Sequence, residues 1–375
     1  MRILHVHSGN MFGGVERMLE TLAPANAGTA PVHSSFALCF GGRASETLRA
    51  AGADVHPLGS VHVRRPDEIW RARRALRELL GAGPWNAVMV HSAWSQGIFG
   101  PTVLKHGMPL VRWLHAPQPG PAWLERLSAR ARPSLVLCNS RYTLDAARKG
   151  LGDAPMTVCY PPSQPSGTGD RDRAEVRRDL HADPGAIVIA IAARMEAWKG
   201  HETLLASLAL LPEGPWEAWI AGGPQRPAEE EYHDRLRATV RNSGLSSRVR
   251  FLGERSDVAR ILQAADIYCQ PNSGAEPFGL SFVEALAAGL PVVTTSIGAA
   301  PEIVNAGCGV LVPPGSARAV ADALRGLIEN SSSRQAMGAC ARVRAQEFCD
   351  LPRSLARLSA ELARVAAASP VPALT

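Results

Sequence analysis

Two carboxylates that follow a strand-like run are the residues of this chain best placed to do chemistry. Glu276 and Glu284 are separated by seven residues and come directly after the run 267–271. We expect Pro277 to start a helix, which leaves Glu276 ahead of the first turn and the N–H groups of Gly279 and Leu280 without helical partners. Either carboxylate alone could complement the helix dipole. The pair indicates more: a site where the acids hold hydroxyl groups and the amides hold a phosphate.

Two cations share another loop that follows a strand-like run. Arg194 and Lys199 come after the run 186–193, and a helical pattern begins immediately beyond Gly200. Arg can grip two phosphate oxygens in fork geometry, and Lys supplies a mobile point charge. This loop therefore suits a diphosphate, although cations in a solvated surface loop would look the same.

A third candidate loop follows the first strand-like run of the chain. Gly13 and Gly14 open a helix that we expect to begin near Val15. Free N–H groups at a helix N-terminus stabilise an anion, and the glycines permit close approach, although they also suit a tight strand-to-helix turn. The loop does not match the G-x-G-x-x-G dinucleotide fingerprint, so an NAD site is only weakly supported.

The elements that position these loops alternate along the chain. Twelve short apolar runs read as strands, and helical patterns lie between most of them, which predicts parallel sheets covered on both faces. Ligands of such sheets bind beyond the carboxyl ends of the strands, where all three loops lie. Pro, Gly and Ser accumulate between Tyr160 and Arg173, so we place a first domain at 1–165, a linker at 166–182 and a second domain at 183–351.

Composition excludes several classes of protein. The 375 residues are 46% hydrophobic and 20% charged, which supports two packed cores rather than disorder. The longest purely apolar run, Ala186 to Ala193, is far shorter than the roughly 20 residues that span a bilayer. The N-terminal run lacks the features of a secretory signal, and the seven cysteines form no C-x-x-C pair, so we expect a cytoplasmic protein without a disulfide framework.

Taken together, these motifs resemble those of the retaining nucleotide-sugar glycosyltransferases of family 4, which have the GT-B fold. The resemblance spans nearly the whole chain. Its motifs are Gly13-Gly14-Val15-Glu16, Arg194, Lys199-Gly200, the E-x7-E element from Glu276 to Glu284, Ala285, Gly289-Leu290-Pro291-Val292-Val293 and Pro301-Glu302-Ile303-Val304. It implies two Rossmann-like domains that face a central cleft, with the acceptor bound by the first and the donor by the second. By analogy with the fold, a final helix at about Ser354 to Ala367 crosses back, so that residues 352–375 complete the first domain.

The resemblance also assigns roles to individual residues. Arg194 and Lys199 would hold the diphosphate, Glu284 the ribose and Glu276 the donor sugar. The other donor-binding residues would be Gly13, Gly14, Gly253, Glu254, Arg255, Phe278, Gly279 and Leu280, with the base resting against 253–255. His115, at the end of a strand-like run, matches a position where relatives place a polar group beside the sugar, although a lone strand-end histidine is often structural.

The implied reaction transfers a sugar from a nucleoside diphosphate sugar to a saccharide, lipid-linked or small-molecule acceptor with retention of configuration. No cofactor is implied, and no metal, because the two cations can neutralise the leaving group. Asp170-Arg171-Asp172 resembles an Asp-x-Asp metal motif but lies in the predicted linker. Other GT-B enzymes, such as an epimerase or a phosphorylase, and a non-catalytic sugar-nucleotide-binding protein remain alternatives.

The chain departs from the family pattern at two places. Ala299-Ala300 stands where a glycine pair is common, and Ser273-Gly274-Ala275 stands where a bulkier residue often precedes the first glutamate. The first change would tighten a loop that faces the ligand and alter which donor fits. Neither change removes a charged group.

The net charge of +6 fits a phosphorylated substrate, an anionic membrane or a nucleic acid. The densest arginine cluster, Arg64 to Arg77, lies on a predicted amphipathic helix, which either covers the core with a solvated basic face or docks on anionic lipid at the inner membrane face. A nucleic-acid partner is not expected, because we do not expect exposed aromatic residues between these arginines, and Tyr and Phe are scarce in the chain.

Overall fold

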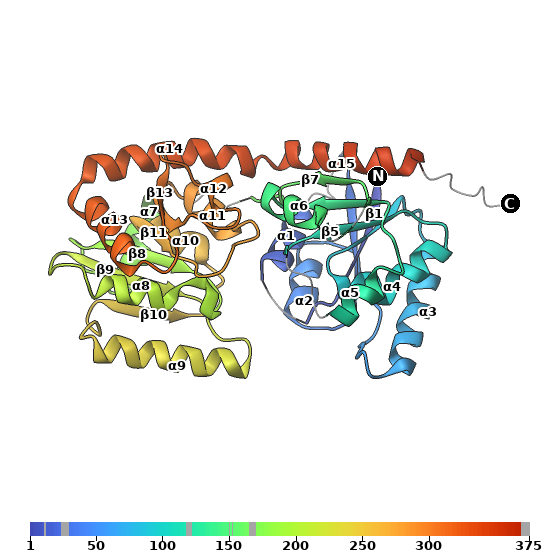
Figure 1. Cartoon of the computed structure of the whole chain (residues 1–375), viewed down its shortest axis with the longest axis horizontal. Coiled ribbons are helices and arrows are strands. Elements are labelled where there is room, and N and C mark those ends of the chain that lie inside the picture. Colours follow the sequence, from blue (N-terminus) through green and yellow to red (C-terminus); the bar gives the residue numbers. More distant parts are fainter. Residues whose placement is uncertain are drawn as a thin grey trace. The chain divides into compact units, whose positions relative to one another are not determined.

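The computed structural model of the chain describes residues 1–10, 13–23, 30–117, 122–149, 151, 153–164 and 170–368. The fold divides into two compact units. Unit 1 comprises Met1–Ser163 with Asp350–Thr375, and unit 2 comprises Gln164–Cys349. Each unit contains one parallel sheet flanked by helices (Figure 1).

Unit 1 is built on a seven-stranded sheet in the order β3-β2-β1-β4-β5-β6-β7. Its strands are β1 Arg2–His7, β2 His33–Leu38, β3 Val55–Pro57, β4 Ala87–Val90, β5 Leu110–Leu114, β6 Leu135–Cys138 and β7 Met156–Val158. Its helices are α1 Gly14–Leu22, α2 Arg43–Ala50, α3 Pro66–Ala82, α4 Ala93–Lys105, α5 Ala122–Ser128, α6 Arg141–Arg148 and α15 Leu351–Ala368. The short β3 is the one strand of this sheet that the sequence pattern did not predict.

Alternate residues of the unit 1 strands enter separate cores on the two faces of the sheet, as the two-residue period of a strand requires. Ile3 and Met89 join α1, α2 and α15 in one core. Leu4 and Val88 join α3 and α4 in the other. The final helix is therefore part of unit 1, and it begins at Leu351, three residues before the expected start.

Unit 2 is built on a six-stranded sheet in the order β10-β9-β8-β11-β12-β13. Its strands are β8 Ile187–Ala192, β9 Trp216–Ala221, β10 Val249–Gly253, β11 Ile267–Gln270, β12 Val292–Thr295 and β13 Gly309–Val312. Its helices are α7 Asp170–Asp179, the 3₁₀ turn η2 Ala197–Lys199, α8 His201–Leu208, α9 Pro227–Asn242, α10 Val258–Ala264, α11 Leu280–Ala287, α12 Ala300–Ile303, α13 Ala317–Glu329 and α14 Ser331–Cys349.

Helix α7 corrects the expectation of a linker at 166–182. Its sequence is almost without apolar residues, but Arg173 and Arg177 donate to the two carboxylate oxygens of Asp266, at 2.7 and 2.5 Å. These ion pairs anchor the helix to unit 2. The Asp170-Arg171-Asp172 triplet forms the first turn of α7, and its side chains lie outside the described residues.

Both sheets reverse their strand order at one point. The reversal lies between β1 and β4 in unit 1 and between β8 and β11 in unit 2. Loops at such a point diverge to opposite faces of the sheet and leave a crevice at the carboxyl ends of the strands.

Candidate active site

Two hydrogen bonds join the loops that follow β8 and β11, where the strand order of the unit 2 sheet reverses. The N–H groups of Ser273 and Gly274 donate to the Trp198 carbonyl oxygen, at 2.9 and 3.3 Å. Lys199 Nζ donates to Glu276 Oε2 at 2.7 Å. Two of the residues predicted from separate motifs therefore form one ion pair.

The two oxygens of the Glu276 carboxylate have different surroundings. Oε2 also accepts hydrogen bonds from Asn272 Nδ2 at 3.1 Å and from Gln270 Nε2 at 3.3 Å. Within the described part of the chain, no hydrogen bond reaches Oε1. Three donors thus fix the orientation of a carboxylate that is 6% exposed, and Oε1 remains available to a ligand hydroxyl.

Two glycines let the backbone approach closely enough to hold this arrangement. Gly200 has a φ of 82°, and a Cβ there would lie 2.0 Å from the Pro271 carbonyl oxygen. Gly298 has a φ of 65°, and its Cβ would lie 2.4 Å from the Glu276 carbonyl oxygen. Any larger residue at either position would push the Lys199 loop or Glu276 out of place.

Sequence reasoning missed the polar network behind Glu276. Tyr268 Oη and Ser281 Oγ both donate to Gln270 Oε1, at 2.6 and 3.0 Å, and Gln270 donates in turn to Asn272 Oδ1 at 2.9 Å. A signal was present: residues 268, 270 and 272 alternate along β11 and beyond its carboxyl end, so they share one side. The network connects the strand to the site and restricts the movement of the carboxylate.

Helix α11 begins at Leu280 rather than at Pro277. The reason is Gly279, whose φ of 95° places it in the left-handed region and makes it the N-cap residue. Phe278 is 3% exposed and packs against Phe348 at 6.0 Å between ring centroids, so its side chain belongs to the core. Glu284 is half-buried in the second turn, and both it and Glu276 act electrostatically on Tyr268, whose pKa is raised chiefly by burial.

Arg194 is paired within its own loop. Its NH2 group donates to Glu196 Oε1 at 2.6 Å, while its buried NH1 group finds no hydrogen-bond partner among the residues that the structure describes. The four charges of Arg194, Glu196, Lys199 and Glu276 therefore cancel. A diphosphate would have to compete with the Glu196 carboxylate for the Arg194 guanidinium. Sequence reasoning did not single out Glu196.

Gly253, Glu254 and Arg255 lie at the carboxyl end of β10, two strands from β8. Gly253 has a φ of 67°. Arg255 donates from Nε and NH2 to the two carboxylate oxygens of Asp257, at 2.8 and 2.7 Å. This pairing raises the pKa of Arg255 and lowers that of Asp257. The Arg255 side chain is therefore fixed, and the backbone at 253–255 shares the carboxyl edge of the sheet with the Lys199 loop.

From the sequence we expected Ala299 and Ala300 to tighten a loop that faces the ligand, but in the structure both residues are buried. They are 0% and 1% exposed, and the Ala299 N–H donates to the Glu276 carbonyl oxygen at 2.8 Å. Methyl groups at these positions face the protein interior. Any influence of this alanine pair on a ligand must act through the backbone position of Glu276.

In unit 1, Gly13 and Gly14 begin α1 as predicted, and a histidine–carboxylate pair lies beside them. Glu16 Oε2 accepts from the Gly13 N–H at 2.8 Å, and Glu16 Oε1 lies 2.7 Å from Nε2 of His7, at the end of β1. Burial raises the pKa of Glu16, whereas the hydrogen bond and the charge interaction with His7 lower it, and the net result is a lowered pKa. Sequence reasoning missed this pair.

His115 lies at the carboxyl end of β5 and is half-buried. Its Nε2 lies 3.0 Å from Nδ1 of His91, which follows β4. Burial lowers the pKa of His115 to about 3, and that of His5, on β1, to about 3. Burial also lowers the pKa of His91 well below its ordinary value. His115 is therefore one of several neutral histidines.

We expect mild acid to destabilise the protein through these histidines and through His201, whose pKa burial lowers to about 4. Each has a lower pKa in the folded than in the unfolded chain, so the unfolded chain binds more protons between the two values. Each contribution is complete above about pH 6.5 and falls by about 1.4 kcal/mol per pH unit below it. The melting temperature should therefore fall between pH 7 and pH 5, a window above most carboxylate titrations. A His201→Phe variant should show a shallower fall, and a constant melting temperature over this range would contradict the expectation.

Two family models match the chain. The model described as "Glycosyl transferases group 1" matches residues 172–344. The model described as "Glycosyltransferase Family 4" matches residues 12–163. The first lies within unit 2 and contains the Lys199–Glu276 pair, and the second lies within unit 1 and contains His115.

Individual relatives match parts of the chain. A D-inositol 3-phosphate glycosyltransferase of Corynebacterium glutamicum (strain R) is 34% identical over 186 residues, which are 48% of this chain and 44% of the relative. The lipopolysaccharide core biosynthesis mannosyltransferase LpsB of Rhizobium meliloti (strain 1021) is 32% identical over 167 residues, 42% of this chain and 46% of the relative. The matched segments thus span less than half the length of these curated relatives.

Solved structures match nearly the whole fold. The structure of Anabaena Alr3699/HepE in complex with UDP and glucose has a TM-score of 0.86 and 24% identity, over 97% of this chain and 100% of that one. A sucrose-phosphate synthase from Thermosynechococcus elongatus has a TM-score of 0.78 and 19% identity, over 98% and 100%. The two doubly wound units are those of the GT-B fold, as predicted. With family models matching residues 12–163 and 172–344, the chain belongs to the group 1 glycosyltransferases.

Proposed function

We propose that this protein is a retaining glycosyltransferase that moves a sugar from a nucleoside diphosphate sugar to an acceptor hydroxyl. The observation that carries the proposal is the Glu276 carboxylate. Its Oε2 is held by Lys199, Asn272 and Gln270, while Oε1 accepts no hydrogen bond from the described residues. A rigid carboxylate with one open oxygen suits a sugar hydroxyl, and it lies three residues before the N-cap of α11.

Each charged group then has a task. Lys199, Arg194 and the first N–H groups of α11, at Gly279 and Leu280, hold the diphosphate and stabilise the charge that develops as it leaves. Glu284 binds the ribose, and the backbone of 253–255 holds the base. Because Glu196 and Glu276 already pair with the two cations, the diphosphate shares Arg194 and Lys199 with these carboxylates, while Asn272 and Gln270 keep the Glu276 carboxylate in place. The proposal includes no metal and no other cofactor.

The transfer step conserves the anomeric configuration. The bond between the anomeric carbon and the phosphate oxygen breaks, and the acceptor oxygen forms its bond on the same face of the sugar. The acceptor proton passes to an oxygen of the leaving phosphate, which therefore acts as the base. Positive charge from Lys199 and the helix amides stabilises that phosphate, so no protein nucleophile is required.

The relatives support the class of donor and of acceptor. The solved relative is described as a complex with UDP and glucose, and another structure of the same protein as a complex with UDP-glucose. A matched curated relative is named as a mannosyltransferase of lipopolysaccharide core biosynthesis. These names favour a nucleoside diphosphate hexose as donor and a saccharide among the possible acceptors.

Product analysis tests the proposal. The protein is incubated with sugar nucleotides and candidate acceptors, nucleoside diphosphate release is measured, and the new glycosidic bond is examined by NMR. We expect the donor's anomeric configuration in the product. An inverted product would exclude the retaining mechanism, and conversion of the donor that never depends on an acceptor would favour an epimerase.

Acidic side chains pair with several arginines of the α3 segment, which the sequence suggested as a membrane contact. Arg65, Arg71 and Arg74 are paired with Glu68, Asp67 and Glu78, at 2.9, 2.5 and 2.8 Å. Much of the basic face is therefore neutralised on the helix itself. Among the described helices, none combines the length and the apolar character needed to cross a membrane.

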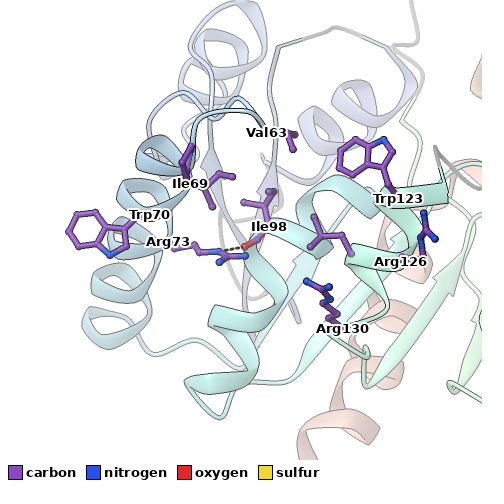
Figure 2. A pocket seen from close by; sticks show the side chains of 10 residues that line it. Val63, Ile69, Trp70, Arg73, Ile98, Trp123, Arg126 and Arg130 are labelled. Atoms are coloured by element: carbon purple, nitrogen blue, oxygen red, sulfur yellow. Dashed lines mark hydrogen bonds between the residues drawn. The ribbon is translucent and has the colours of Figure 1, made fainter.

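A hollow of about 630 Å³ beside α3 offers a better contact (Figure 2). Arg73 reaches across to donate to the Ile98 carbonyl oxygen of α4 at 2.6 Å. Trp70, Trp123, Arg126 and Arg130 also line the hollow. Trp70 and Trp123 are 62% and 47% exposed. Tryptophan beside arginine suits the interface of an anionic bilayer, so we propose peripheral contact here.

We expect the protein to co-sediment with vesicles that contain anionic phosphatidylglycerol and not with vesicles of phosphatidylcholine alone. A Trp70→Ala/Trp123→Ala variant should bind several-fold more weakly, because it loses both aromatic anchors. Arg71→Ala, which removes a paired surface arginine of the same helix, is the matched control. Equal sedimentation with both kinds of vesicle would refute membrane contact.

A further inference from the structure

Three imidazole rings form a continuous hydrogen-bonded row across the unit 1 sheet. His5 Nδ1 lies 3.0 Å from His91 Nε2, and His91 Nδ1 lies 3.0 Å from His115 Nε2. The three residues come from β1, from the end of β4 and from the end of β5. Of the three, only His115 was a candidate site residue from the sequence, so the other two need a separate explanation.

Strand geometry accounts for the row. The sheet order places β1, β4 and β5 side by side. The ring centroids of His5 and His91, and of His91 and His115, are 5.3 Å apart in both cases, with interplanar angles of 12° and 20°. This spacing is close to the roughly 4.8 Å between neighbouring strands. One imidazole per strand, on the face that also holds Met89, therefore aligns into a row.

The two ends of the row differ. At the inner end, His5 Nε2 lies 3.1 Å from Oγ of Ser34, which is on β2 and 1% exposed. At the outer end, His115 is half-buried, and among the described residues nothing forms a hydrogen bond with its Nδ1. The row thus runs from a buried hydroxyl to an open ring nitrogen at the carboxyl edge of the sheet.

The inner rings have surroundings that keep them uncharged. His5 and His91 are 0% and 4% exposed, and their hydrogen-bond partners are Ser34 and other imidazoles rather than carboxylates. The Glu16 carboxylate pairs with His7, and His7 meets His91 edge-on, at 5.9 Å between ring centroids. No group of three or more potential ligand side chains in the described residues is arranged for a metal ion.

We propose that Ser34, His5 and His91 are positioning residues that hold His115 with Nε2 engaged and Nδ1 directed at a sugar hydroxyl. The proposal deepens the proposed function and rests on it for the identity of the ligand. A neutral row can run in two directions, with every ring protonated at Nδ1 or every ring protonated at Nε2. His115 Nδ1 is then a donor or an acceptor. A hydroxyl can satisfy both states, whereas a phosphate oxygen can satisfy only the first.

The row also restrains the ring mechanically. An isolated imidazole at a strand end can rotate about its side-chain bonds and exchange tautomers freely. Here a rotation of His115 would break its bond to His91 and leave a buried nitrogen of that ring without a partner, which is costly. His91 thus orients His115 in the same way that a hydrogen-bond partner on the second ring nitrogen orients a histidine that binds a metal.

NMR of the wild-type protein labelled with ¹⁵N-histidine tests the row without any assumption about the reaction. At pH 7 we expect three neutral rings of one shared tautomer, assigned by their loss or shift in His91→Phe and His115→Ala. Mixed fixed tautomers among the three rings, or a protonated ring, would overturn the proposal.

Steady-state kinetics test the positioning role. His91→Phe keeps a ring of similar size but removes both nitrogens. We expect about a tenfold loss of kcat/KM, carried mainly by KM for the sugar substrate, with His115→Ala losing at least as much and His5→Phe losing less. Met89→Leu, on the same strand and face, is the matched control and should remain within twofold of wild type.

These experiments distinguish a failure of the positioning role from a failure of the proposed function. If His91→Phe folds and its kcat/KM stays within twofold of wild type, the positioning role is wrong. If His91→Phe does not fold, His91→Asn, which keeps one polar group in place of the ring, carries the same comparison. If wild type transfers no sugar but the NMR pattern is present, the row stands and the proposed function fails.

Discussion

Lys199→Ala will lower kcat/KM for sugar transfer by about 10²- to 10³-fold, the loss typical when one group that stabilises a developing negative charge is removed. Lys199 Nζ is the cation that touches Glu276, at 2.7 Å, and its side chain is only 16% exposed. Its ammonium group also lies 3.9 Å from the ring centroid of Trp198. Alanine removes the positive charge that would bind the diphosphate, and it also removes the donor that orients the Glu276 carboxylate. Both substrate binding and the chemical step should therefore be weakened.

Lys105→Ala is the matched control for this experiment, because Lys105 is an exposed lysine at the end of α4 in the other unit. Its activity should equal that of wild type. The melting temperature of each variant must be measured as well, since the loss of one partner of a buried ion pair destabilises a protein. A folded Lys199→Ala protein with kcat/KM within threefold of wild type would show that this lysine does not act on the donor.

Removal of residues 351–375 will unfold unit 1. The helix lost in this truncation contributes Leu355, Leu358, Leu362 and Val365 to the same core as Ile3 and Trp113. Their exposed fractions are 5%, 1%, 0% and 8%. Burial of each such side chain contributes about 1.5–3 kcal/mol, so the four together approach the whole stability of a typical domain.

A single substitution offers a graded version of this test. Leu358→Ala should cost about 2–5 kcal/mol and lower the melting temperature of unit 1 by several degrees. Arg357→Ala, its exposed neighbour on α15, should change it little. If the truncated chain melts at the same temperature as the full chain, the final helix is not part of the core of unit 1.

The sequence predicted most of the fold because buried parallel strands are short apolar runs bounded by Gly or Pro. Twelve such runs correspond to strands of the structure, and the missed strand, β3, has three residues, none of them buried. Helix α7 could not be predicted from hydrophobic periodicity, because Arg173 and Arg177 anchor it to Asp266, 93 and 89 positions later in the sequence. Ion pairs between distant residues leave no periodic pattern.

The candidate site was predictable as a set of loops but not as a set of contacts. Lys199 and Glu276 were predicted separately, whereas their ion pair depends on β8 and β11 being neighbours. Glu196, which neutralises Arg194, looked like an ordinary loop residue. The histidine row had a signal, because three strand-like runs carry a histidine at or near the carboxyl end, but the alignment depends on the strand order β1-β4-β5.

We propose that unit 2 binds a nucleoside diphosphate sugar through the segment from Glu276 to Glu284. The most direct test is thermal stabilisation of wild type, Glu284→Ala and the exposed-residue control Glu230→Ala by UDP, GDP, ADP and their hexose conjugates, because a ligand that binds only the folded state raises its melting temperature. We predict that one nucleoside diphosphate and its sugar stabilise wild type and Glu230→Ala by several degrees and leave Glu284→Ala unchanged. If none of these compounds stabilises wild type, or if Glu284→Ala responds as wild type does, the proposed donor site is contradicted.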